Sequence, residues 1–237
     1  MPPSAALGAF FDSLELSRQL VVQESQYPDP PDPPHDALVK GLRGGAAILM
    51  VAAFEEFLRS VFQERLSDLV GVSPVIEFSK LPEVTQTTSV FYSLEISMGR
   101  RGRGSRGRKV DRLPAISKSA GLIVAGRLDP AALADMNSNP NSETVGSLFR
   151  ALAVSQIFEQ VRSEFDLIWG KPEAVTFLPD KLDEIVQRRH VIAHTADALK
   201  ITREQLSEAV RYLECLATVL DDELARVVGG FRVSAAP

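Results

Sequence analysis

The chain has 237 residues, of which 45% are hydrophobic and 24% charged, and its net charge is −5. This length and composition are ordinary for a soluble globular protein with a substantial core. No apolar run reaches the roughly 18 residues of a membrane span, the N-terminus lacks a signal layout, and the single Cys215 excludes both an intramolecular disulfide and a thiolate-built zinc site. We therefore expect a cytoplasmic protein that does not associate with membranes.

The first third of the sequence predicts two helices joined by a stiff connector. Apolar residues at helical spacing predict an amphipathic helix over residues 4–24, and the proline-rich segment 27–35 cannot be helical. Asp36 can cap a long helix that continues to Gly71 and is apolar on nearly all sides, as a central helix should be. We therefore divide the chain into an N-terminal helix and connector, residues 1–35, and one helical domain, residues 36–237.

A basic segment interrupts the helical pattern between residues 99 and 112. Seven basic residues and one acid give residues 100–112 a local charge of +6, so with a total of −5 the rest of the chain carries −11. Such a distribution is not typical of a general nucleic-acid-binding protein, but it indicates one place where a polyanion could be held. The glycine-rich composition of residues 99–109 predicts a flexible loop.

The rest of the chain predicts further helices and no strand. Helices are expected from about Pro82 onward, over 114–125, 142–152 and 155–169, and from about Leu178. Thr202 and Gln205 match a capping box that opens a long final helix with a leucine-rich stripe. There is no strand-like alternation and no internal repeat, so the sequence predicts an all-α architecture.

The most informative stretch is R-R-H-V-I-A-H at residues 188–194, which holds two of the three histidines. Leu178, Leu182, Ile185 and Ile192 share one helical stripe, and Arg189 occupies the position that continues it. A guanidinium group that cannot lose its charge is a poor choice for an ordinary core. We therefore expect this stripe to meet a cleft, a partner subunit or an anion at Arg189.

The motif has the groups needed to cleave RNA without a metal or other cofactor. A histidine can remove the 2′-hydroxyl proton, and an arginine can bind the phosphate and stabilise its developing charge. The products would be a 2′,3′-cyclic phosphate and a 5′-hydroxyl, and DNA, which lacks the internal nucleophile, should survive. Arg189 and His194 are five residues apart, about 140° around an ideal helix. Their convergence requires a bend near His194 or a two-fold dimer that faces two motifs.

These residues resemble the signature of the HEPN superfamily, an arginine followed by a polar residue and then a histidine on the penultimate helix. The apolar helix with F-E-E-F-L, the segment N-P-N-S-E-T-V-G-S-L-F and the long last helix are similar to the RiboL-PSP-type branch, over roughly Asp36 to Val228. The resemblance implies an HEPN-like helical bundle that forms a homodimer and acts as a metal-independent endoribonuclease. It also implies a toxin–antitoxin or anti-phage setting, with an antitoxin or defence-system protein as a further partner.

The expected site follows from the motif and its surroundings. We expect His194 to be the general base and Arg189 to bind the scissile phosphate, with His190 assisting. Glu55 and Glu56, which interrupt the apolar central helix, and Glu184 are candidate supporting acids, the last by resemblance to an acidic position in some HEPN ribonucleases. The candidate RNA-binding residues are all basic: Arg188, Arg100, Arg101, Arg103, Arg106, Arg108 and Lys109.

Other interpretations remain open at this stage. Arg189 could pair with Glu55 or Glu56 across the bundle while His194 caps a helix end. His190 and His194 have a metal-binding spacing, but Val191 stands where the protease form of that motif needs Glu. As a whole, the domain could instead be a non-catalytic HEPN module for dimerisation or partner binding, or the regulatory partner of a separate toxin.

Overall fold

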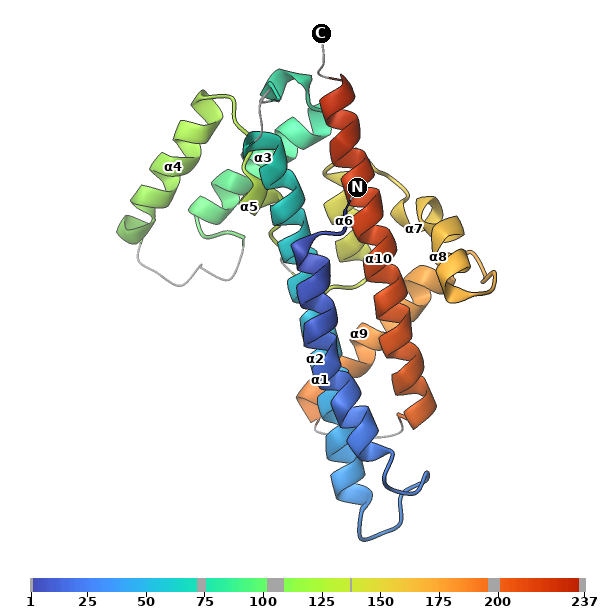
Figure 1. The fold of residues 1–237 in the computed structure, drawn as a ribbon. Helices are drawn as coiled ribbons and strands as arrows, with labels where there is room; N and C mark the ends of the chain where they lie inside the picture. The colour runs from blue at the N-terminus through green and yellow to red at the C-terminus, as the bar shows by residue number, and fades with distance from the viewer. Residues whose placement is uncertain (1, 72–75, 102–108, 137, 196–200, 235–237) are drawn as a thin grey trace.

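The structure, a computed structural model, confirms the all-α prediction. It describes residues 2–71, 76–101, 109–136, 138–195 and 201–234, and only the backbone of residues 194–195 and 233–234. Within these ranges the chain forms α-helices and two short 3₁₀ turns, η1 and η2, and no strand (Figure 1). In chain order the elements are α1 Ala5–Glu24, α2 Asp36–Gly71, η1 Phe78–Lys80, α3 Glu83–Ser97, η2 Lys109–Arg112, α4 Leu113–Val124, α5 Pro130–Leu133, α6 Ser142–Arg150, α7 Ile157–Gln160, α8 Arg162–Trp169, α9 Phe177–Thr195 and α10 Arg203–Ser234.

The long helix α2 is the centre of the bundle, with α1, α9 and α10 packed against it (Figure 1). Its buried side chains include a run of phenylalanines and aliphatic residues that form the main core. Among the described helices, α2 is long and apolar enough to cross a membrane, with a mean hydropathy of 1.6 over its most apolar window. However, its Arg43 and Arg65 are buried and paired with carboxylates of the same chain, as expected for a core helix of a soluble domain.

Helix α1 is fastened to the bundle at its N-terminal end. Ser4 caps the helix by accepting a hydrogen bond from the Leu7 backbone N–H, and its own N–H donates to Asp221 Oδ2 at 2.9 Å. The other oxygen of Asp221 accepts from Arg65 Nε at 3.0 Å. Phe10 is buried against two phenylalanine rings of α2. The N-terminal helix is therefore packed into the main core.

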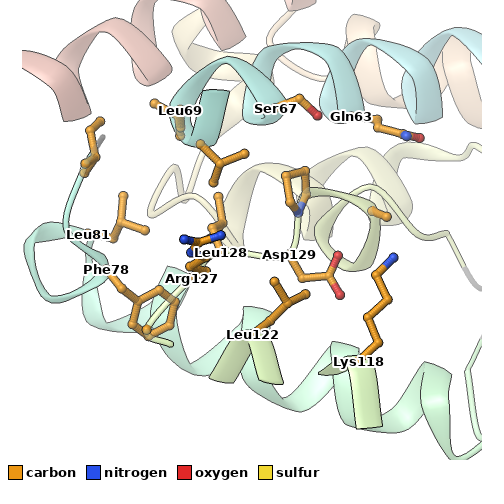
Figure 2. Close-up of a pocket in the computed structure, with 15 residues that line it drawn as sticks. Gln63, Ser67, Leu69, Phe78, Leu81, Lys118, Leu122, Arg127, Leu128 and Asp129 are labelled. Atoms are coloured by element: carbon orange, nitrogen blue, oxygen red, sulfur yellow. The ribbon is translucent and has the colours of Figure 1, made fainter. Parts of the chain in front are cut away.

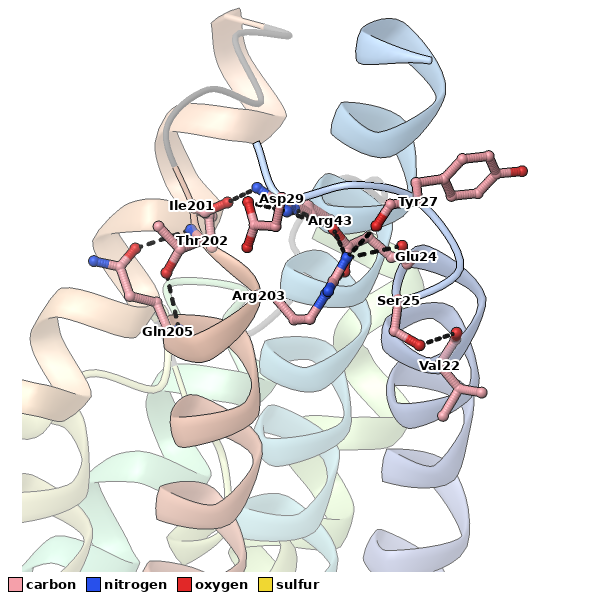
Figure 3. A network of polar contacts seen from close by, with 10 residues as sticks. All are labelled: Val22, Glu24, Ser25, Tyr27, Asp29, Arg43, Ile201, Thr202, Arg203 and Gln205. Carbon is pink, nitrogen blue, oxygen red and sulfur yellow. Dashed lines mark hydrogen bonds and ion pairs between the residues drawn. The ribbon is translucent and has the colours of Figure 1, made fainter. Parts of the chain in front are cut away.

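The opposite end of α1 takes part in a second buried ion-pair network, which we call the clasp (Figure 3). Its centre is Glu24, whose side chain is fully buried and accepts from Arg43 of α2 and from Arg203 at the start of α10. Arg43 also donates to the Ile201 carbonyl at 2.9 Å and pairs with Asp29 at 3.0 Å. The clasp thus joins the end of α1 and the proline-rich connector to α2 and to the beginning of α10.

Helices α3 and α4 form an arm at one side of the bundle, where α4 stands apart from the long helices (Figure 1). The buried residues of α3 recur every fourth position and are all small and polar: Thr85, Ser89, Ser93 and Ser97. Ser97 contacts the Ser119 hydroxyl of α4 at 2.6 Å, and Ser93 donates to Asp129 at 2.9 Å. Hydrogen bonds between small side chains therefore hold this arm, whereas apolar packing holds the main bundle.

The predicted helix over 155–169 is divided into α7 and α8 by a break at Val161. Ile157, Val161, Phe165 and Trp169 are all buried and lie four residues apart, so the pattern of apolar residues is continuous across the break. Side-chain periodicity reports which face is buried, and it cannot report an interruption of the backbone hydrogen bonds. Ahead of α3, residues 78–80 form the short 3₁₀ turn η1.

Candidate functional site

Helix α9 carries the motif and is held along one buried face. Leu178, Leu182, Ile185 and Ile192 are all buried, which confirms the predicted stripe. At the start of the helix, the Tyr212 hydroxyl of α10 donates to the Leu178 carbonyl. Burial raises the pKa of Tyr212 well above its ordinary value, and the negative charge of Asp183 raises it further, so this hydroxyl keeps its proton.

Arg189 lies on the same stripe and is only partly buried. Its Nη1 donates to the side-chain oxygen of Asn139 at 3.2 Å, and its Nε is buried with no hydrogen-bond partner among the described residues. In that part of the chain, Arg189 forms no ion pair with Glu55 or Glu56, and both of these acids pair instead with Arg59 of their own helix. The partner of the motif arginine is therefore a neutral amide from a distant loop.

The loop that supplies Asn139 is fixed by the first turn of α6. The Asn141 side chain caps α6 by accepting from the Thr144 N–H at 2.9 Å, and Thr144 Oγ1 donates to the Asn139 carbonyl at 2.7 Å. Ser142 donates twice to Asp183 of α9, from its backbone N–H and its hydroxyl, each at 2.7 Å. Residues 139–142 are therefore attached to α9 at two points, six residues apart on that helix.

An open cleft of about 580 Å³ lies between this loop and α9. All of its lining residues except Val186 have polar or charged side chains, and the full set is Asn139, Asn141, Asp180, Asp183, Glu184, Val186, Gln187 and His190. His190 lines the cleft and is exposed. Among the described residues, no three His, Cys, Asp or Glu side chains are grouped so that they could hold a metal ion.

The acidic and basic neighbours of Arg189 are largely paired with one another. Glu184 pairs with Arg188 one turn later and with Lys181 at 3.3 Å. The predicted supporting acid Glu184 therefore contacts Arg188, a candidate RNA-binding residue, and this pairing reduces the positive charge that Arg188 offers to a phosphate. His194, the expected base, lies in the last turn of α9, and its side chain is outside the described part of the chain.

The basic segment begins beside the asparagine loop. Arg101 lies 3.5 Å from the Tyr92 ring centroid, pairs with Asp135 at 3.3 Å and is only 14% exposed. Arg101 also lines a small cavity together with Ser138, which directly precedes Asn139, and Thr144 in the first turn of α6. The contacts of Arg101 are thus with side chains of the folded domain, whereas Arg100 and Lys109 are exposed. The remaining candidates, Arg103, Arg106 and Arg108, lie outside the described residues.

Another cavity, of about 490 Å³, lies between the end of α2, η1, α4 and the start of α5 (Figure 2). Much of its lining is apolar, and its charged residues are Lys118, Arg127 and Asp129. Asp129 already caps α5 through the Ala132 N–H and accepts from Ser93. The charged groups of this cavity do not form a catalytic arrangement, so the cleft beside α9 is the candidate site.

Two residues of this site, Asn139 and Asp183, have no role that sequence reasoning assigns. For Asn139, the signal in the sequence is the segment N-P-N-S-E-T-V, which contains a helix cap and is part of the resemblance to the RiboL-PSP-type branch. However, the contact between Asn139 and Arg189 joins residues 50 positions apart. Spacing along the chain carries no information about such a contact, because it depends on how α6 packs on α9.

The comparisons with known proteins add one finding to this geometry. A search of curated proteins found no match, and a search of solved structures found none. A sequence model of the RiboL-PSP-HEPN family matches residues 12–226, from within α1 to within α10 and including the asparagine loop and α9. The chain therefore belongs to the RiboL-PSP-HEPN family, whose domains are typically ribonucleases.

Proposed function

We propose that this chain is a metal-independent endoribonuclease that cleaves RNA by attack of its own 2′-hydroxyl. The observation that carries this proposal is the placement of Arg189 beside a polar cleft with a neutral amide as its partner. Its full positive charge remains available to an anion, and a phosphate is the anion for which a guanidinium group offers matching donors.

Each motif residue has one role in the proposed reaction. His194 removes the proton of the 2′-hydroxyl, whose oxygen then forms a bond to phosphorus while the bond to the 5′-oxygen breaks. Arg189 binds the phosphate and stabilises the charge that develops on its oxygens. His190 assists from the cleft. The departing 5′-oxygen takes up a proton from water, so the products are a 2′,3′-cyclic phosphate and a 5′-hydroxyl.

The basic segment supports this function through its charge. Arg101 ties the beginning of the segment to Asp135, four residues before Asn139. The exposed Arg100 and Lys109, together with Arg103, Arg106 and Arg108, would draw the RNA backbone toward the cleft. We further propose that the chain acts as a cytoplasmic homodimer in a toxin or anti-phage defence setting, as the family resemblance implies.

The test is incubation of the purified chain with total cellular RNA in excess EDTA, beside an Arg189→Ala/His194→Ala variant. We expect cleavage that leaves 2′,3′-cyclic phosphates and 5′-hydroxyls, with no cleavage of DNA and none by the variant. Circular dichroism establishes that the variant is folded, and light scattering after gel filtration reports the oligomeric state.

Expression of the chain provides a second measurement. A ribonuclease should arrest growth of the host, and His194→Ala should relieve the arrest while leaving the protein folded. A folded wild-type chain that neither cleaves RNA nor affects growth contradicts the proposed function and favours a non-catalytic binding module or the regulatory partner of another protein.

A further inference from the structure

The partner of Arg189 is chemically unusual for a half-buried arginine. Such arginines are commonly paired with a carboxylate, because burial without a counter-charge is costly. In the described part of the chain, Arg189 instead donates only to the amide oxygen of Asn139, at 3.2 Å. A neutral acceptor orients the guanidinium group without cancelling its charge.

The carboxylates closest along α9 are held by other partners. Both oxygens of Asp183 accept from Ser142, and Glu184 pairs with Lys181 and Arg188. These contacts direct Asp183 and Glu184 toward groups other than Arg189. The arrangement therefore separates the motif arginine from the counter-charges that would compete with a phosphate for it.

Asn139 is itself held firmly enough to orient a neighbour. Its backbone carbonyl accepts from Thr144 Oγ1 at 2.7 Å and from the Asn141 N–H at 2.8 Å. The turn that contains it is closed by the α6 cap and attached to α9 through Ser142 and Asp183. The first turn of α6 therefore fixes the backbone from which the Asn139 side-chain amide reaches Arg189.

We propose that Asn139 is a positioning residue, which holds the Arg189 guanidinium group beside the cleft while leaving its charge free for the RNA phosphate. This inference rests on the proposed ribonuclease function. It assigns to Asn139 two separable properties: the hydrogen bond that orients Arg189 and the neutrality that preserves its charge.

The two properties are separated by two substitutions and one matched control. Asn139→Ala removes the orienting bond, and Asn139→Asp keeps an acceptor but converts the contact into an ion pair. Asn141→Asp places the same negative charge in the same cleft two residues away, where aspartate caps a helix as well as asparagine does. It therefore measures the repulsion that any added carboxylate exerts on RNA.

With a randomised single-stranded RNA, we expect Asn139→Asp to lower the cleavage rate on the order of 100-fold, as for loss of one charge-stabilising donor. Asn141→Asp should lower it about threefold or less, because water in the open cleft screens an added charge that is not paired with Arg189. Asn139→Ala should lower the rate at saturating RNA more than it raises KM, since orientation matters most in the transition state. Equal losses in Asn139→Asp and Asn141→Asp would overturn the inference.

Failure of the wild-type chain to cleave RNA would count against the proposed function alone. A binding measurement then still tests the role of Asn139. The probe is the all-2′-deoxy counterpart of the same oligonucleotide, which lacks the nucleophile. Loss of one phosphate contact in Asn139→Asp should reduce the slope of log affinity against log salt by about 0.7. A slope equal to that of Asn141→Asp contradicts the role of Asn139.

A double-substitution cycle in urea provides the structural control. Asn139→Asp should raise the midpoint of unfolding when Arg189 is present and lose that gain in an Arg189→Gln background. Equal shifts in the two backgrounds would show that the two side chains do not interact in solution, and the inference would then be wrong.

Discussion

Ser142 at the start of α6 donates two hydrogen bonds to Asp183 of α9, one from its backbone N–H and one from its hydroxyl, both at 2.7 Å. This contact between Ser142 and Asp183 has two consequences for the fold. The first turn of α6 has backbone N–H groups without helical partners, and a carboxylate at a helix N-terminus satisfies them and complements the helix dipole. The same contact fixes the loop of Asn139 on the helix that carries the motif.

Replacement of Asp183 by alanine should therefore affect stability slightly and activity strongly. Both bonds are solvent-accessible, so the free energy of unfolding should fall by only about 1 kcal/mol. Cleavage should fall further than this loss explains, because Asn139 is no longer held against α9. Ser142→Ala keeps the backbone bond and serves as the control, and urea unfolding and RNA cleavage rates measure the two effects. Activity equal to that of wild type in Asp183→Ala would show that the loop is positioned without this contact.

Glu24 at the centre of the clasp should be critical for stability. Its fully buried carboxylate faces Arg43 and Arg203, and Glu24→Gln leaves both guanidinium groups without their shared counter-charge. Breaking one side of a buried ion pair costs about 3–5 kcal/mol. The matched control is Glu15→Gln on the same helix, where the pair with Arg18 is half exposed and its loss should not be measurable. Equal midpoints of urea unfolding for the two variants would contradict the importance of the clasp.

Asp29 should make the stability of the clasp depend on pH. Its hydrogen bond with Arg43 lowers the pKa of the carboxyl group in the folded state, so at acidic pH the unfolded state binds protons more readily. The stability that Asp29 contributes is therefore complete above its unfolded pKa of about 3.9 and is lost as the pH falls through the lower folded value. The difference in unfolding free energy between wild type and Asp29→Asn should be constant near neutrality and shrink below about pH 4. A difference that does not change with pH in urea titrations would refute this assignment.

Cys215 should be chemically inert in the folded protein. It lies in the core on α10, and burial raises the pKa of its thiol, so the reactive thiolate is scarce. Iodoacetamide should label native protein at least about tenfold more slowly than urea-unfolded protein, as mass spectrometry would show. Comparable rates in the two states would mean that this part of α10 opens readily in solution.

Several features of the fold could be predicted from sequence because they depend on local chemistry. The central helix α2 has the predicted bounds, and the capping box at Thr202 and Gln205 forms both of its reciprocal hydrogen bonds. Caps, helical periodicity and left-handed glycines such as Gly170, with φ +89°, involve residues within a few positions of one another. The unusual placement of Arg189 on an apolar stripe also follows from periodicity alone.

Contacts between distant residues could be decided only by the tertiary structure. Arg189 could have met Glu55 or Glu56, because both interrupt the apolar face of the neighbouring helix, yet the packing of α6 on α9 gives it Asn139 instead. Likewise, nothing in the sequence near Glu24 indicates that Arg203, 179 residues later, shares its carboxylate. Sequence patterns determine which side chains a helix offers to its neighbours. The partners themselves are chosen by how the helices pack, because hydrogen bonds and ion pairs form only between groups that the whole fold brings within about 3 Å.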